Sequence, residues 1–90
     1  MNAPVEQAKQ TAISAQVIDI LARVADTDEV RTNHGVALYD LQVLDSMKTV
    51  ELIVALQQEM NVDISPAEFD RDAWATPAKM VADVEKRLAA

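Results

Sequence analysis

The sequence contains no cysteine, and its 90 residues include a single glycine and only one residue each of tryptophan, tyrosine and phenylalanine. The absence of cysteine excludes disulfides, thiolate metal sites and any thiol nucleophile that belongs to the protein itself. The scarcity of glycine and of aromatic residues, together with abundant alanine, leucine and valine, favours helix over sheet. A chain of this length forms one small domain. We therefore predict a single all-α domain over residues 1–90.

Basic residues are also few, since 8 Lys and Arg stand against 15 Asp and Glu, which gives a net charge of −7. Such a surface repels nucleic acid and anionic membranes, so basic proteins are the expected partners. The sequence has no run of about 18 apolar residues that could cross a membrane, and its first residues do not resemble a signal peptide. We predict a monomeric cytoplasmic protein that neither binds nucleic acid nor inserts into the membrane.

Apolar residues recur at steps of three and four in three segments, which predicts three main helices. The helices run from about residue 10 to 25, from Ser46 to about Met60, and from Pro77 to near Ala89. Their predicted inward faces consist of Ile13, Val17, Ile20, Leu21 and Val24 in the first, Thr49, Leu52, Ile53, Leu56 and Met60 in the second, and Met80, Val81, Val84 and Leu88 in the last. Residues 1–9 precede this pattern and are predicted to form a flexible extension.

The connections between the main helices differ in length. The stretch from Ala25 to Asp45 is long for a small bundle and rich in polar and turn-forming residues. We predict an ordered loop, with room for one short helical turn, that is anchored on the core by Val36, Leu38, Leu41 and Leu44. The fold is therefore predicted to be a bundle of three main helices plus one short helix, with a long loop between the first two main helices.

The short helix is predicted between the second and third main helices. Ser65, Pro66 and Glu68 have the spacing of a capping box with proline at the first helical position. Phe69 and Trp74 follow among charged residues, and we expect these two side chains to attach the segment to the core. Thr76 followed by Pro77 repeats the cap-and-proline pattern at the start of the last helix.

Ser46 lies directly after Asp45, at the point where the long loop ends and the second helix begins. The carboxylate of Asp45 can cap this helix, because it can accept a hydrogen bond from the backbone N–H groups of the first turn. Ser46 is then exposed at the start of the helix, where an attached phosphate would meet the positive end of the helix dipole. By itself this pair is a weak signal, since most Asp-Ser pairs at helix starts are only caps.

A second stripe of side chains runs along the second helix, beside the stripe predicted to face the core. Its members are Met47, Val50, Glu51 and Val54. One interpretation is that the helix is buried on two sides. The other is that the stripe binds a partner protein lined with Arg and Lys, while the carboxylates of Asp40, Asp45 and Glu59 at its rim steer the encounter.

The sequence shows no catalytic or metal-binding motif. His34 is the sole histidine and has no neighbouring group typical of a catalytic triad, so we expect it to have a surface or structural role. Asp70 and Asp72 lack the downstream glycine and glutamate of a calcium loop. We therefore predict neither a metal site nor a catalytic residue.

Two stretches carry a resemblance to a known family. Leu44-Asp45-Ser46-Met47, followed by Thr49-Val50-Glu51-Leu52, resembles the modification site and second helix of acyl carrier and peptidyl carrier proteins. Glu68-Phe69-Asp70-Arg71-Asp72, with Trp74, Thr76-Pro77 and Lys79, is more narrowly similar to the D-alanyl carrier proteins of teichoic acid D-alanylation. The resemblance covers most of the chain, although Met1 to Thr11 match nothing in it.

The resemblance implies an acyl-carrier-like bundle, and it implies a carrier and not an enzyme. A phosphopantetheinyl transferase would attach 4′-phosphopantetheine from coenzyme A to Ser46, and the terminal thiol of this arm would hold D-alanine as a thioester. An ATP-dependent ligase would load the D-alanine, and membrane acyltransferase machinery would accept it. Two alternatives stay open. One is a general acyl carrier of a fatty acid, polyketide or other aminoacyl pathway, and the other is an acidic helical adaptor that has no prosthetic group and binds a protein through its second stripe.

Lys48 departs from the pattern of these relatives, because it stands where the subfamily usually has glycine. A cation in the first turn of a helix opposes the helix dipole. One interpretation is a solvated lysine with a cost of a few tenths of a kcal/mol. The other is that Lys48 contacts the phosphate of the arm or an acidic patch on a partner.

Overall fold

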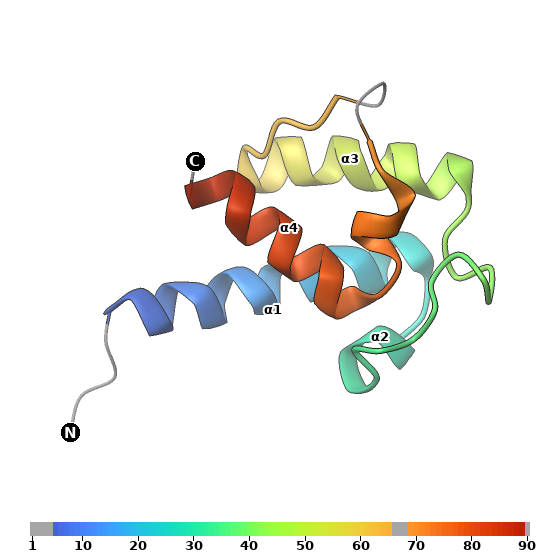
Figure 1. The fold of residues 1–90 in the computed structure, drawn as a ribbon, viewed down its shortest axis with the longest axis horizontal. Helices are drawn as coiled ribbons and strands as arrows, with labels where there is room; N and C mark the ends of the chain where they lie inside the picture. Colours follow the sequence, from blue (N-terminus) through green and yellow to red (C-terminus); the bar gives the residue numbers. More distant parts are fainter. Residues whose placement is uncertain (1–4, 66–68, 90) are drawn as a thin grey trace.

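The structure is a computed structural model that describes residues 5–65 and 69–89, and it consists of helices joined by loops (Figure 1). Its elements in chain order are α1 (Val5–Ala25), α2 (Glu29–Thr32), α3 (Ser46–Met60), the 3₁₀ helix η2 (Arg71–Trp74) and α4 (Pro77–Ala89). Within these two ranges no residue belongs to a strand. The predicted all-α fold with three main helices is confirmed.

The central helix of the fold is α1, which packs against α2, α3 and α4. Figure 1 shows α3 and α4 lying along the same half of α1, so that both cover its C-terminal part. Val17, Ile20 and Leu21 of α1 are buried, while Ile13 and Val24 are partly buried against the same core. The predicted inward face of this helix is confirmed.

The start of α1 differs from the prediction, since the helix begins at Val5 and not near residue 10. Residues 5–9, which were predicted to belong to a flexible extension, therefore lie in a helix, and residues 1–4 are outside the described part of the chain. Apolar periodicity marks only the part of a helix that packs on a core. The Glu, Gln, Ala, Lys and Gln at positions 6–10 are favourable helix formers and extend the helix beyond that part.

The bounds of α3 and α4 match the prediction. In α3, Thr49, Leu52, Ile53 and Leu56 are buried and Met60 is partly buried. Asn61 ends this helix in the left-handed conformation, with a φ of 57°, and its N–H donates to the carbonyl oxygens of Leu56 and Gln57. The helix therefore stops where its apolar periodicity stops.

The prediction for the inward face of α4 is wrong at one residue. Met80 and Val84 are fully buried and Val81 is partly buried, but Leu88 is 39% exposed. Leu88 lies in the last turn of α4, beyond Val84, which is the last residue of this helix that the core encloses. Periodicity alone cannot show where along a helix the core ends.

The loop between α1 and α3 is ordered and contains the expected helical turn, α2, whose Val30 is buried. Val36, Leu38 and Leu44 anchor the loop as predicted, whereas Leu41 is 63% exposed. A tight turn explains this error, because the N–H of Leu44 donates to the carbonyl of Leu38 at 2.9 Å and so brings both ends of the turn onto the core. Leu41 lies at the tip of the turn and points away from the core.

The short helix after α3 is η2, and the Asp70 carboxylate caps it by accepting a 3.0 Å hydrogen bond from the N–H of Asp72. Pro66 and Glu68 of the predicted capping box lie outside the described residues. Trp74 is fully buried, and its indole N–H donates to Asp83 at 2.9 Å. Phe69 packs edge-on against it, with ring centroids 4.7 Å apart. The prediction that Phe69 and Trp74 attach this segment to the core is confirmed.

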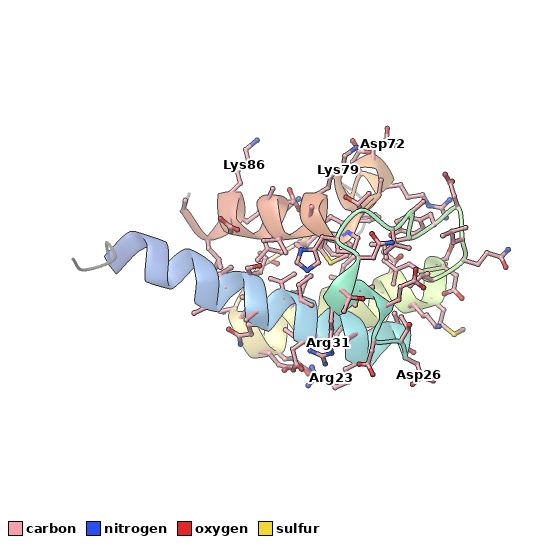
Figure 2. All side chains as sticks on the ribbon, turned by 90° about the horizontal axis from the view of Figure 1, so that it is seen from below. Arg23, Asp26, Arg31, Asp72, Lys79 and Lys86 are labelled. Atoms are coloured by element: carbon pink, nitrogen blue, oxygen red, sulfur yellow. The ribbon has the colours of Figure 1, made fainter. Side chains whose placement is uncertain are left out.

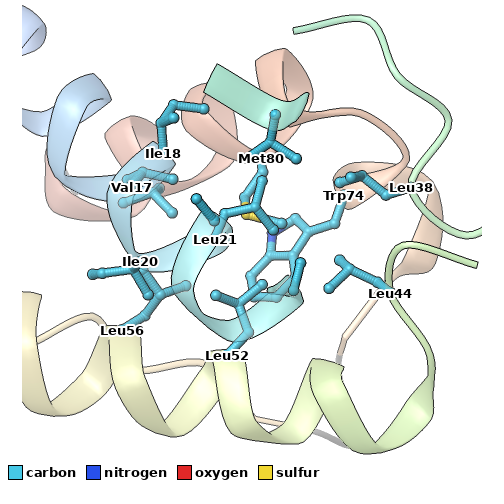
Figure 3. Packing of buried hydrophobic residues seen from close by; sticks show 14 of the residues in the cluster. Val17, Ile18, Ile20, Leu21, Leu38, Leu44, Leu52, Leu56, Trp74 and Met80 are labelled. Atoms are coloured by element: carbon cyan, nitrogen blue, oxygen red, sulfur yellow. The ribbon is translucent and has the colours of Figure 1, made fainter. Parts of the chain in front are cut away.

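The core lies between α1, α3, η2 and α4, and the long loop contributes side chains to it as well. Figure 3 shows Leu21 of α1, Leu52 of α3, Trp74 of η2 and Leu44 of the long loop pointing toward one another. Because Leu44 belongs to this cluster, the start of α3 is held directly on the core. The position of Ser46, two residues later, is therefore set by core packing.

Candidate functional site

Asp45 is the N-cap of α3, as the sequence predicts. Its backbone is extended, and its carboxylate accepts a 2.8 Å hydrogen bond from the N–H of Lys48. Its carbonyl oxygen accepts the first hydrogen bond of the helix, at 2.9 Å from the N–H of Thr49. Ser46 is the first residue of the helix and its side chain is exposed. The structure therefore presents the Ser46 hydroxyl to solvent at the positive end of a four-turn helix.

A chain of hydroxyl groups braces this helix start against the long loop. The Thr49 hydroxyl donates to the carbonyl oxygen of Asp45 at 2.7 Å. The Tyr39 hydroxyl lies 2.7 Å from the Thr49 oxygen. Threonine has a single hydroxyl proton, and Thr49 already donates it to the Asp45 carbonyl oxygen. Tyr39 is therefore the donor in the second contact. The loop and the first turn of α3 are thus joined beside Ser46.

Tyr39 is half-buried, and this burial raises the pKa of its phenol above the usual value. The hydrogen bond to Thr49 and the positive charge of Arg71 act in the opposite direction and are smaller effects. The Arg71 guanidinium lies over the Tyr39 ring, 4.8 Å from the ring centroid. Tyr39 is therefore a neutral donor at physiological pH, and it supports a guanidinium close to the site.

A cavity of about 350 Å³ lies beside Ser46. It is lined by Ser46, Thr49, Val50, Ile53, Phe69 and Arg71. The hydroxyl-bearing residues Ser46 and Thr49, a mostly apolar surface and one guanidinium therefore meet in a single cavity. From the sequence, Ser46 is predicted at the site and Phe69 is predicted to pack on the core, while no role is predicted for Arg71. The only sequence signal that could have placed these two residues at the site is their position in the run from Glu68 to Asp72, which resembles the relatives named above.

The second stripe of α3 is exposed. Met47, Val50 and Val54 have exposed fractions of 74%, 51% and 44%, and Glu51 is exposed as well. The interpretation that α3 is buried on two sides is therefore wrong, because α1 covers only one face of α3. Asp40, Asp45 and Glu59 at the predicted rim are also exposed. The stripe remains available to a partner, beginning within one turn of Ser46.

Known proteins match this chain over most of its length. Residues 15–84 match the family model described as a phosphopantetheine attachment site. The D-alanyl carrier protein of Lacticaseibacillus casei is 44% identical over 75 residues, which cover 83% of this chain and 93% of that protein. The D-alanyl carrier protein of Staphylococcus saprophyticus is 41% identical over 71 residues, covering 79% and 91%. That of Listeria monocytogenes is 38% identical over 74 residues, covering 82% and 95%.

The chain belongs to the D-alanyl carrier protein family. As a member of this family it is a carrier and not a catalyst, and its prosthetic group is covalently attached 4′-phosphopantetheine. The start of α3 fits such a group, because it combines an exposed hydroxyl with the positive end of a helix dipole. The cavity beside this hydroxyl is lined by both apolar side chains and one guanidinium.

Lys48 makes a contact within the chain that neither interpretation of the sequence included. Its side chain is partly buried, and its ammonium donates to the carbonyl oxygen of Ala25, the last residue of α1, at 3.4 Å. A cation at a helix C-terminus is stabilising, which compensates for its unfavourable place at the start of α3. Lys48 is therefore partly solvated and is held at the end of α1. Lys48 does not line the cavity beside Ser46, and a contact with a partner remains a prediction.

The remaining candidate residues have structural roles. His34 is exposed, and its carbonyl oxygen accepts a 3.0 Å hydrogen bond from Ala78, which ties the long loop to α4. Across residues 5–65 and 69–89, no three His, Asp or Glu side chains are grouped in a way that could hold a metal ion. In the same part of the chain, no helix is both long and apolar enough to span a bilayer.

Proposed function

We propose that Ser46 is the attachment point of 4′-phosphopantetheine and that the chain carries D-alanine on it for the D-alanylation of teichoic acid. The observation that supports the attachment point is the exposed hydroxyl of Ser46 at the capped start of α3. The cargo is proposed from the similarity to D-alanyl carrier proteins, of which three are 38–44% identical to this chain.

In the proposed attachment, the Ser46 oxygen forms a bond to the β-phosphorus of coenzyme A and loses its proton. The bond from that phosphorus to the bridging oxygen breaks, and adenosine 3′,5′-bisphosphate leaves. The start of α3 favours the resulting phosphodiester through its dipole and its N–H groups. When bound, the group supplies a terminal thiol that holds the amino acid as an activated thioester. The chain has no cysteine that could compete for this acyl group.

The exposed stripe is the proposed docking surface for a phosphopantetheinyl transferase, a D-alanine ligase and a membrane acyltransferase. Met47, Val50 and Val54 supply apolar contact area next to Ser46. Asp45 and Glu51 supply negative charge that steers basic partners. One small surface close to the attachment point allows these partners to bind in turn. We also propose a cytoplasmic location, where the coenzyme A and ATP required for attachment and loading are available.

Intact-mass measurement tests the attachment point. After incubation with coenzyme A and a transferase of broad specificity, the wild type is expected to gain the mass of one phosphopantetheine group, whereas Ser46→Ala gains none. Ser65→Ala is the matched control, because Ser65 is also exposed but lies in the segment after α3, and it should be modified like the wild type. An unmodified wild type would support the adaptor hypothesis. Modification of Ser46→Ala would refute the assignment of Ser46.

A loading assay tests the cargo. The modified protein is incubated with ATP and D-alanine ligase, and in parallel reactions with ligases specific for other amino acids or fatty acids. We expect a thioester adduct with D-alanine. Loading by a fatty acid ligase, but not by the D-alanine ligase, would instead identify a general acyl carrier.

A further inference from the structure

Arg71 differs from the other three arginines of the chain. Arg23 pairs with Glu59, Arg31 with Asp19 and Asp28, and Arg87 with Asp83. Within residues 5–65 and 69–89, no ion pair is recorded for Arg71, whose guanidinium instead lies on the face of the Tyr39 ring. Tyr39 is in turn held by its hydrogen bond to Thr49. The contact with this ring restrains the guanidinium, which carries five N–H donors suited to an anion.

The position of Arg71 relates it to Ser46. Both residues line the same cavity of about 350 Å³, together with the apolar side chains of Val50, Ile53 and Phe69. Lys48 is closer to Ser46 in sequence, but its ammonium is bound at the end of α1 and does not line this cavity. Arg71 is far from Ser46 in the sequence, but the packing of the fold places both residues on the same cavity. The cavity volume falls within the range of about 300–1,000 Å³ that is usual for sites of small molecules.

We propose that Arg71 binds the phosphodiester of a prosthetic group attached to Ser46 and directs the arm along the apolar surface of Val50, Ile53 and Phe69. This inference rests on the proposed function of Ser46. A guanidinium suits the phosphodiester because it offers paired N–H donors to phosphate oxygens. The apolar wall suits the aliphatic part that follows the phosphate. An arm bound in this way has a preferred resting position on the carrier and leaves it when a partner's active site binds the arm more strongly.

Amide and arginine side-chain NMR tests this proposal without any loading reaction. In the wild type, attachment of the arm is expected to shift the resonances of Ile53, Phe69 and the Arg71 side chain, in addition to those of Ser46 and Met47. In Arg71→Gln, the shifts of Ile53 and Phe69 should be lost, while those of Ser46 and Met47 persist. Arg71 is exposed, so this substitution should preserve the fold, which the spectrum of the unmodified variant verifies.

Arg23→Gln is the matched control. It removes the same charge from a residue that lines a different cavity from Ser46, and Figure 2 shows Arg23 and Arg31 together on the side of the molecule away from Asp72. This variant should show the full wild-type pattern of shifts. If attachment shifts only Ser46 and its neighbours in the wild type, or if Arg71→Gln matches the wild type, the proposed role of Arg71 is wrong. These results all require a modified protein, so they are distinct from a failure of modification, which would refute the function proposed for Ser46.

Discussion

The two faces of α3 are built from similar residues but have opposite environments. Leu52 and Leu56 are fully buried against the core, whereas Met47, Val50 and Val54 are between 44% and 74% exposed. Both sets recur at helical spacing, so neither composition nor periodicity distinguishes them. The difference lies in what packs against each face, since α1 covers the first and no described element covers the second. The first face stabilises the fold, and the second is available for partners of the carrier.

Truncation of the buried face should have the largest effect on stability. Leu52→Ala is expected to lower the free energy of unfolding by about 2–5 kcal/mol, because it removes buried methyl groups and leaves a cavity. Val54→Ala on the exposed face is the matched control and should stay within about 0.5 kcal/mol of the wild type. Urea denaturation followed by circular dichroism measures both values. A similar loss for the two variants would mean that the exposed face also packs in solution.

Truncation of the exposed face should instead affect the partners. Met47→Ala is expected to raise the KM of the protein as a substrate of its transferase or ligase by roughly tenfold, which corresponds to about 1.4 kcal/mol of lost contact energy. Its stability should be unchanged. Leu88→Ala removes a partly exposed apolar side chain from α4 and serves as the control. Equal KM values for Met47→Ala and the wild type would contradict a role of this stripe in docking.

Removal of the hydrogen bond between the long loop and the first turn of α3 should have the smallest effect. Tyr39→Phe removes the partly buried hydrogen bond between Tyr39 and Thr49. This should lower the free energy of unfolding by about 0.5–1 kcal/mol at neutral pH. The raised pKa of Tyr39 adds a pH dependence. Above the ordinary phenol pKa of 10.0 the unfolded chain loses this proton first, so the wild type loses stability as the pH rises through the folded-state pKa.

Tyr39→Phe lacks this titration, and its deficit relative to the wild type should therefore shrink as the pH rises above about 10. Urea midpoints of both proteins at neutral and alkaline pH provide the measurement. A constant difference across this range would show that burial of the phenol does not perturb its titration.

Several local features of the fold are predictable from the sequence. The bounds of α3 follow from the Asp45 cap and the end of apolar periodicity at Met60, and the start of α4 follows from Thr76 and Pro77. These signals act over one or two helical turns, so they are present in the linear sequence. The early start of α1 could not be found in this way, because it depends on helix propensity beyond the packed part of the helix.

The wrong prediction for Leu41 in the long loop has a different origin. Leu41 has the same character as Leu38 and Leu44, but the turn between these two residues places it at the tip, away from the core. In a segment without regular periodicity, the direction of a side chain depends on the path of the backbone. The sequence therefore predicts that apolar residues anchor the loop on the core, but it does not show which of them points to solvent.

The sequence by itself determined the three main helices apart from the start of α1, the capped start of α3 and the presence of a serine at that start, because caps and periodicity involve residues within a few positions of one another. The tertiary structure decided which stripe of α3 is buried, that Lys48 reaches the end of α1, and that Phe69 and Arg71 share a cavity with Ser46. These contacts join residues about 20 or more positions apart. They form only when the long loop and η2 pack on the common core.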